Sequence, residues 1–179
     1  MSLPFSNAPK GDVEITEVEM MRREALETAI VNENLTPLTR YCRMGECIES
    51  YYTFTNLQQE SQGEKLYETE VLVYRYGMGE PTGEWIFKSA PTRVLCSTYR
   101  PMVVDFDGDE YLLTHLSPGN LPPGFQTDYD ALYWDICHGL SVSEFQQNQS
   151  RSELARELGY DLNREPSQTR QNFIELIER

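Results

Sequence analysis

The fold is decided by the stretch LYETEVLVYRY, which occupies residues 66–76. Polar and apolar residues alternate along much of it, and β-branched and aromatic side chains are frequent, which is typical of a β-strand. Residues 47–55 show the same pattern and precede it across a polar turn at residues 58–63. The two stretches predict an antiparallel pair on which the rest of a sheet can be built.

Further strands are predicted after this pair, at residues 84–88, 93–99, 102–106 and 110–114. The last two are joined by Asp107-Gly108, a dipeptide that accepts the positive φ angles of a type I′ turn. We therefore expect a curved antiparallel sheet of about six strands, arranged as a meander or as a partly closed barrel.

Helices are predicted before and after the strands along the chain. Thr16 and Glu19 form a capping box before apolar residues at helical spacing, so a helix is expected to begin at Glu17. After the Pro-rich and Gly-rich loop at 117–125, capping signals open three short helices, at Thr127, Ser141 and Ser150. A terminal helix is expected after Pro166, with the apolar residues Phe173, Leu176 and Ile177. The fold class is therefore α+β, with one N-terminal helix and three or four C-terminal helices.

The expected domain organisation is simple. Residues 1–14 are interpreted as a flexible tail, because they hold two Pro and one Gly and show no periodicity. Residues 15–179 are expected to form a single globular domain. Its first part, 15–116, combines the helix and the antiparallel sheet, and its second part, 126–179, is helical.

Composition limits the classes of partner. The chain has 179 residues and a formal net charge of −14, so it repels phosphate backbones, and no direct nucleic-acid binding is expected. No window approaches the roughly 20 apolar residues that a membrane span needs. We expect a soluble, cytoplasmic protein without a membrane partner. Four cysteines are too few for a disulfide framework in such a chain, and they are interpreted as reduced, small apolar residues.

The negative charge is unevenly distributed. Residues 101–150 contain no Lys or Arg but hold eight acidic residues. This asymmetry favours a non-catalytic binding or assembly protein, an adaptor that engages a basic surface of a partner macromolecule by electrostatic steering and aromatic anchoring. A close variant is a nucleic-acid mimic that blocks a DNA-binding protein. The predicted partner-binding residues carry a carboxylate or an aromatic ring: Asp105, Asp107, Asp109, Glu110, Tyr111, Asp128, Tyr129, Asp130, Tyr133 and Trp134.

The aromatic residues of the strands support an alternative function. A barrel-like carrier or lyase could bind a small aromatic or tetrapyrrole-sized ligand in a Tyr-rich pocket, because rings on strands form apolar walls with polar edges. The predicted ligand-binding residues are Tyr52, Phe54, Tyr74, Tyr76, Trp85 and Phe87. Packing of these rings in the core is the competing interpretation.

Catalytic and metal signatures are weak. The acidic run at 105–110 does not fit the register of an EF-hand loop, and Cys42 and Cys47 supply only two of the four ligands that structural zinc requires. His115 and His138 are the only imidazoles, and a third hypothesis, a metal-independent enzyme, requires one of them beside a carboxylate. No catalytic residue, metal ligand or cofactor is assigned.

Overall fold

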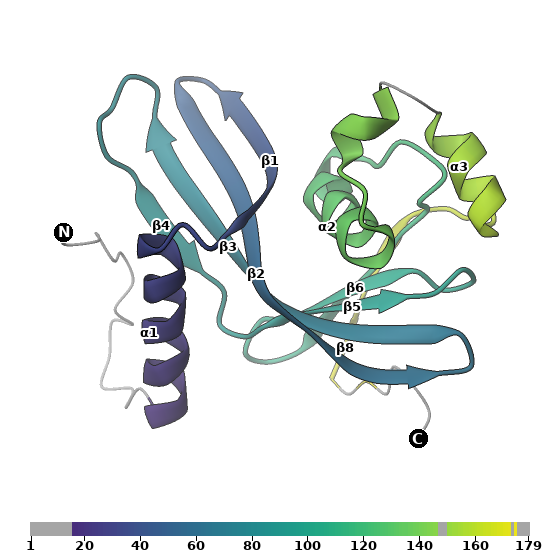
Figure 1. The fold of residues 1–179 in the computed structure, drawn as a ribbon, viewed down its shortest axis with the longest axis horizontal. Coiled ribbons are helices and arrows are strands. Elements are labelled where there is room, and N and C mark those ends of the chain that lie inside the picture. The colour runs from purple at the N-terminus through teal and green to yellow at the C-terminus, as the bar shows by residue number, and fades with distance from the viewer. Residues whose placement is uncertain (1–15, 147–149, 173, 175–179) are drawn as a thin grey trace. The chain divides into compact units, whose positions relative to one another are not determined.

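The computed structural model describes residues 16–146, 150–172 and 174 (Figure 1). It has an α+β fold with an antiparallel sheet of eight strands, and three α-helices lie within the described residues. The predicted tail at 1–14 lies outside this range, as do Phe173, Leu176 and Ile177 of the predicted terminal helix.

The strands follow one another as an open path. Their bounds are β1 (Thr36–Arg43), β2 (Glu46–Ser61), β3 (Glu64–Gly77), β4 (Glu84–Phe87), β5 (Thr92–Cys96), β6 (Met102–Phe106), β7 (Tyr111–His115) and β8 (Ser167–Gln171). The order is β1-β2-β3-β5-β6-β7-β8, and β4 pairs with β3 beside this path. The predicted antiparallel sheet is confirmed, whereas the partly closed barrel is wrong, because the path runs from β1 to β8 without closing.

The two strands that the sequence did not predict are at the ends of the path. β1 has exposed or half-buried side chains throughout and contains Pro37, so it lacks the alternation that marks a strand with one buried face. Residues 167–171 were predicted as part of a terminal helix, but they form β8, which pairs with β7 from Tyr111↔Gln171 to His115↔Ser167. The segment is polar at every position, so hydrogen bonds offered by β7 decide its conformation.

The helices follow their caps. α1 (Glu17–Val31) begins where the capping box predicts, since the Thr16 hydroxyl accepts a hydrogen bond of 3.2 Å from the Glu19 amide. α2 (Thr127–His138) and α3 (Arg151–Leu158) both end at a glycine in the left-handed conformation. The helix predicted to begin at Ser141 is a 3₁₀ turn, η2 (Val142–Gln146), and another such turn, η1 (Gly124–Gln126), precedes α2. The C-terminal part therefore holds two α-helices within the described residues, fewer than predicted.

The chain divides into two compact units, which are described separately. Unit 1 comprises residues 1–53 and 72–87, and unit 2 comprises residues 54–71 and 88–179. Strands β2 and β3 each contribute one part to unit 1 and one part to unit 2. The single-domain interpretation stays a prediction.

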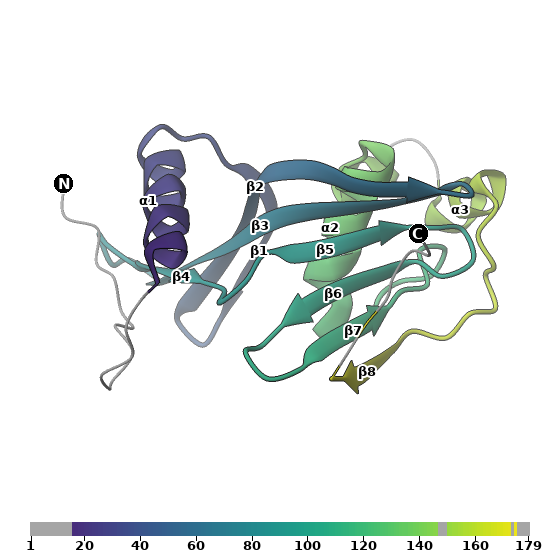
Figure 2. The ribbon, with the colours of Figure 1, turned by 90° about the horizontal axis from the view of Figure 1, so that it is seen from below.

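Unit 2 has a core on each face of its strands. One face carries the buried side chains of Leu66, Leu95, Met102, Val104 and Leu113, with Tyr111 and Ile174 packed against them. On the other face, α2 packs on β5 and β6 (Figure 2). In unit 1, Leu26 and Ala29 are the buried residues of α1.

All four cysteines form disulfides, so the prediction of reduced thiols is wrong. Cys42 and Cys47 face each other in the register of β1 and β2, across a turn in which Met44 and Gly45 have positive φ angles. Cys96 at the end of β5 is bonded to Cys137 in the last turn of α2. The first pairing follows from hairpin geometry, because facing residues bring their Cβ atoms close enough for a disulfide.

Candidate functional site

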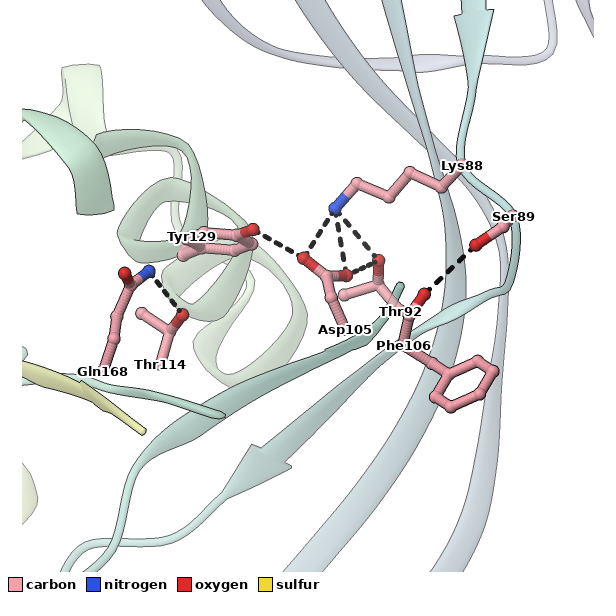
Figure 3. A network of polar contacts seen from close by, with 8 residues as sticks. All are labelled: Lys88, Ser89, Thr92, Asp105, Phe106, Thr114, Tyr129 and Gln168. Carbon is pink, nitrogen blue, oxygen red and sulfur yellow. Dashed lines mark hydrogen bonds and ion pairs between the residues drawn. The ribbon is translucent and has the colours of Figure 1, made fainter. Parts of the chain in front are cut away.

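Asp105 of the predicted partner-binding set lies inside a polar network of unit 2 (Figure 3). Its carboxylate accepts hydrogen bonds from Lys88 Nζ at 2.9 and 3.0 Å, from the Thr92 hydroxyl at 2.7 Å and from the Tyr129 hydroxyl at 2.5 Å. Burial alone would raise the pKa of Asp105, but the charge of Lys88 and these hydrogen bonds hold it below its ordinary value. Asp105 is therefore ionised and already neutralised within the protein.

The tip of the β6–β7 hairpin is also matched by a cation. Arg170 of β8 donates to Asp107 at 2.9 Å and to Glu110 at 3.2 Å. Asp107 also accepts hydrogen bonds from the backbone amides of Asp109 and Glu110. These two hydrogen bonds, and the contact with Arg170 in addition, lower the pKa of Asp107. The Asp109 side chain is exposed. Within the described residues, no group of His, Cys, Asp or Glu side chains has an arrangement that could hold a metal ion.

The helical members of the predicted set are mostly buried. Asp130 is 2% exposed and accepts a hydrogen bond of 2.7 Å from Arg151, and burial raises its pKa to about 6 despite this partner. Tyr133 and Trp134 are 0% exposed, so neither ring can anchor a partner on this surface. Asp128 is exposed. Four of the eight acidic residues of this segment, Asp105, Asp107, Glu110 and Asp130, are thus paired with a cation inside the protein, so the segment does not form one unpaired patch.

Unit 1 brings four aromatic side chains together, and they are called the aromatic cluster below. It consists of Tyr51 on β2, Tyr74 and Tyr76 on β3, and Trp85 on β4, all half-buried. The ring centroids of Trp85 lie 5.6 Å from Tyr51 and 4.9 Å from Tyr74, and Tyr74 lies 5.5 Å from Tyr76. The contacts are tilted, with interplanar angles of 51°, 38° and 32° respectively. Each ring is half-buried and so keeps part of its surface exposed to solvent.

A carboxylate and a guanidinium lie at the edge of the cluster. Glu49 accepts the hydroxyls of Tyr51 at 2.6 Å and Tyr76 at 3.0 Å. Arg40 Nε donates to the Tyr76 hydroxyl at 3.1 Å and lies 3.5 Å from Glu49. Burial and the Glu49 carboxylate raise the pKa of Tyr51 to about 12, so its hydroxyl stays protonated. The cluster thus combines apolar rings with both hydrogen-bond donors and acceptors.

Gly83 allows β4 to approach this cluster closely. A Cβ atom at this position would lie 2.7 Å from the Tyr74 ring and 2.8 Å from Tyr76 Cβ, and it would also clash with the Arg75 carbonyl oxygen. A side chain cannot fit there unless β4 or the rings move. The geometry of the cluster therefore depends on this glycine.

The predicted ligand-binding set is brought together only in part. Tyr74, Tyr76 and Trp85 are in the cluster, and Tyr52 and Phe87 are half-buried elsewhere in unit 1. Phe54 belongs to unit 2, has a positive φ of 55° and is 42% exposed. Tyr51 was missed. Glu49 and Tyr51 are two residues apart and so share a face of β2. This spacing of a carboxylate and a phenol is the feature of the sequence that could have indicated Tyr51 as a site residue.

A pocket of about 110 Å³ lies in unit 2. Its lining includes Tyr111 of the predicted partner-binding set, which packs on Phe106 with 4.9 Å between ring centroids. Glu68 and Arg93 also line it.

Among the residues that the structure describes, neither histidine is paired with an acid. His115 Nε2 lies 3.0 Å from the Thr169 hydroxyl, and His138 Nε2 lies 2.6 Å from the Tyr160 hydroxyl. Burial lowers the pKa of both imidazoles, with the charge of Arg164 contributing at His115. Within the described part of the chain, neither ring hydrogen-bonds to a carboxylate, so the arrangement required for general-base catalysis is not assembled.

No described helix has the length and apolar character needed to cross a membrane. No family model, curated protein or solved structure matches this chain.

Proposed function

We propose that this protein is a non-catalytic binding protein whose aromatic cluster takes a planar aromatic ligand carrying polar groups. The observation that supports this most is the cluster itself, in which three contacts join four half-buried rings and Glu49 accepts the hydroxyls of the two terminal rings, Tyr51 and Tyr76. Aromatic pairs contribute about 0.5–1.5 kcal/mol beyond the burial of their area, so a ligand that stacks on two rings gains from both. Glu49 and Arg40 then orient its polar groups.

The ligand size that the cluster favours is that of several fused or linked rings. The ring contacts form a continuous series from Tyr51 through Trp85 and Tyr74 to Tyr76, and each step is 4.9–5.6 Å long. A single small ring would cover only one step of this series, whereas a linear tetrapyrrole could cover several. We therefore choose biliverdin as the first probe.

The test compares two tyrosine variants of unit 1. Tyr74 contacts two rings of the cluster, whereas Tyr41 on β1 is 59% exposed and is not part of it. Tyr74→Leu should weaken biliverdin binding about tenfold, and Tyr41→Leu should leave it unchanged. Equal affinities of the two variants and the unaltered chain would exclude the cluster as the site.

A second proposal keeps the acidic segment as a surface for a basic protein. The observation that favours it is the exposure of Asp109 and Asp128, together with the net charge of −14. Long-range steering by this charge would bring a basic partner to the hairpin tip. Neutralising both aspartates to Asn should reduce the association rate at low salt and weaken its salt dependence. An unchanged rate would remove this surface from consideration.

The disulfides bear on where the protein acts. Disulfides persist mainly in oxidising compartments, and both pairs here are part of the fold. We therefore propose an oxidising setting in place of the predicted cytoplasmic one. Protein from its native host, alkylated without prior reduction, should show no modified cysteine, and alkylation of all four would contradict this.

A further inference from the structure

The pocket of unit 2 contains two opposite charges that no other described residue neutralises. Glu68 on β3 and Arg93 on β5 are directly opposite in the strand register, and both are half-buried. Within the described residues, neither side chain forms a hydrogen bond or an ion pair. Nearby acids differ in this respect, since Glu64 is held by Arg100 at 2.7 Å and Asp105 by Lys88 at 2.9 Å.

The rest of the pocket wall is mainly apolar. Val104 and Phe106 share one face of β6, and Asp105 lies on the other. Figure 3 shows the ring of Phe106 pointing away from the Asp105 network. Ala90, Pro91 and the Tyr111 ring, which makes a tilted contact with Phe106, complete the wall. The Asp105 carboxylate is held by Lys88, Thr92 and Tyr129, so it adds no unpaired charge to the pocket.

We propose that this pocket binds a small free α-amino acid of about the size of alanine. Arg93 holds the carboxylate, Glu68 holds the ammonium group, and the wall formed by Phe106 and Tyr111 receives the side chain. A zwitterion satisfies both charges at once, whereas a ligand with one charge leaves the other protein charge uncompensated in a half-buried position. The pocket volume of about 110 Å³ gives room for a molecule of this size.

Three small molecules separate this proposal from simple charge attraction. Isothermal titration of the full chain with L-alanine, propionate and ethylamine compares the zwitterion with each of its charged halves. Alanine should bind at least about tenfold more tightly than either half, because only the zwitterion forms a charge-assisted hydrogen bond with both Arg93 and Glu68. Undetectable alanine binding at millimolar concentration, or equal binding of the three molecules, would overturn the proposal.

Variants then assign the two roles. Arg93→Gln and Glu68→Gln should each weaken alanine binding about tenfold or more, while Arg93→Lys keeps part of it. Lys65→Gln is the matched control, because Lys65 is an exposed cation on the same strand as Glu68, outside the pocket lining. Urea midpoints of all variants show whether the fold is kept. Alanine affinity that Arg93→Gln and Glu68→Gln leave unchanged would place the site elsewhere and overturn the assignment.

Discussion

Removing the disulfide between Cys96 and Cys137 should destabilise the protein more than removing the one between Cys42 and Cys47. The first closes a loop with a sequence separation of 41, and the second closes one with a separation of 5. The entropy that a cross-link removes from the unfolded chain grows with the logarithm of loop length. On this basis the free energy of unfolding should fall by about 4 kcal/mol for the long loop and about 2 kcal/mol for the short one.

The assay is equilibrium unfolding in urea, followed by far-UV circular dichroism, of the double variants Cys96→Ser/Cys137→Ser and Cys42→Ser/Cys47→Ser. Fluorescence of Trp134, which lies in unit 2 three residues before Cys137, follows the long loop separately when Trp85 is replaced by Phe. The midpoint should shift about twice as far for the first double variant when the slope is unchanged. An equal or larger loss from Cys42→Ser/Cys47→Ser would show that loop length does not decide how much each disulfide stabilises the fold.

Three further predictions concern single side chains. Burial raises the pKa of Asp130 to about 6, so the folded state binds its proton more tightly than the unfolded state. Stability from this group is fully present below the ordinary Asp pKa and is lost as pH rises toward 6. When urea midpoints are plotted against pH, Asp130→Asn should therefore flatten this part of the curve. The pKa of Asp105 is lowered, so the pH dependence is reversed: stability from this group is present above the ordinary Asp pKa and is lost as pH falls through the lowered value. Asp105→Asn should reduce the free energy of unfolding at neutral pH by about 3–5 kcal/mol, because Lys88 loses its partner. The same variant should no longer lose this stability in acid. Gly83→Ala should lower the free energy of unfolding by about 1–3 kcal/mol and weaken biliverdin binding, because the added Cβ meets Tyr74 and Tyr76. Normal biliverdin affinity in this variant would show that binding does not require the close approach of β4.

Local signals in the sequence predicted much of the fold. The capping box at Thr16 and Glu19 marks the start of α1, and Ser150 caps α3 as its spacing indicates. The predicted hairpin of β6 and β7 is present and Gly108 has a positive φ, but Asp107 does not, and residues 107–110 form the connection in place of the predicted two-residue type I′ turn. These features depend on residues close together in the chain, so a pattern can reveal them.

The missed features depend on residues far apart in the chain. Arg170 neutralises Asp107 over a sequence distance of 63, and β8 forms because β7 offers it hydrogen bonds. The absence of Lys and Arg from residues 101–150 suggested an unpaired acidic surface, but the partners Lys88, Arg151 and Arg170 come from outside that segment. Charge along the chain therefore did not predict charge on the surface. For the aromatic cluster, alternation alone could not show that Tyr51 would meet Trp85, because the position of β4 depends on Gly83.

The fluorescence of Trp85 reports whether the aromatic cluster is an accessible ligand site. The chain has two tryptophans, and Trp134 is 0% exposed, so Trp134→Phe leaves a single reporter inside the cluster. We predict that biliverdin quenches Trp85 in a saturable manner and that Tyr74→Leu in the same background shifts the curve to higher concentration. Quenching that rises linearly without saturation, and equally in both proteins, would show that biliverdin does not bind at the cluster.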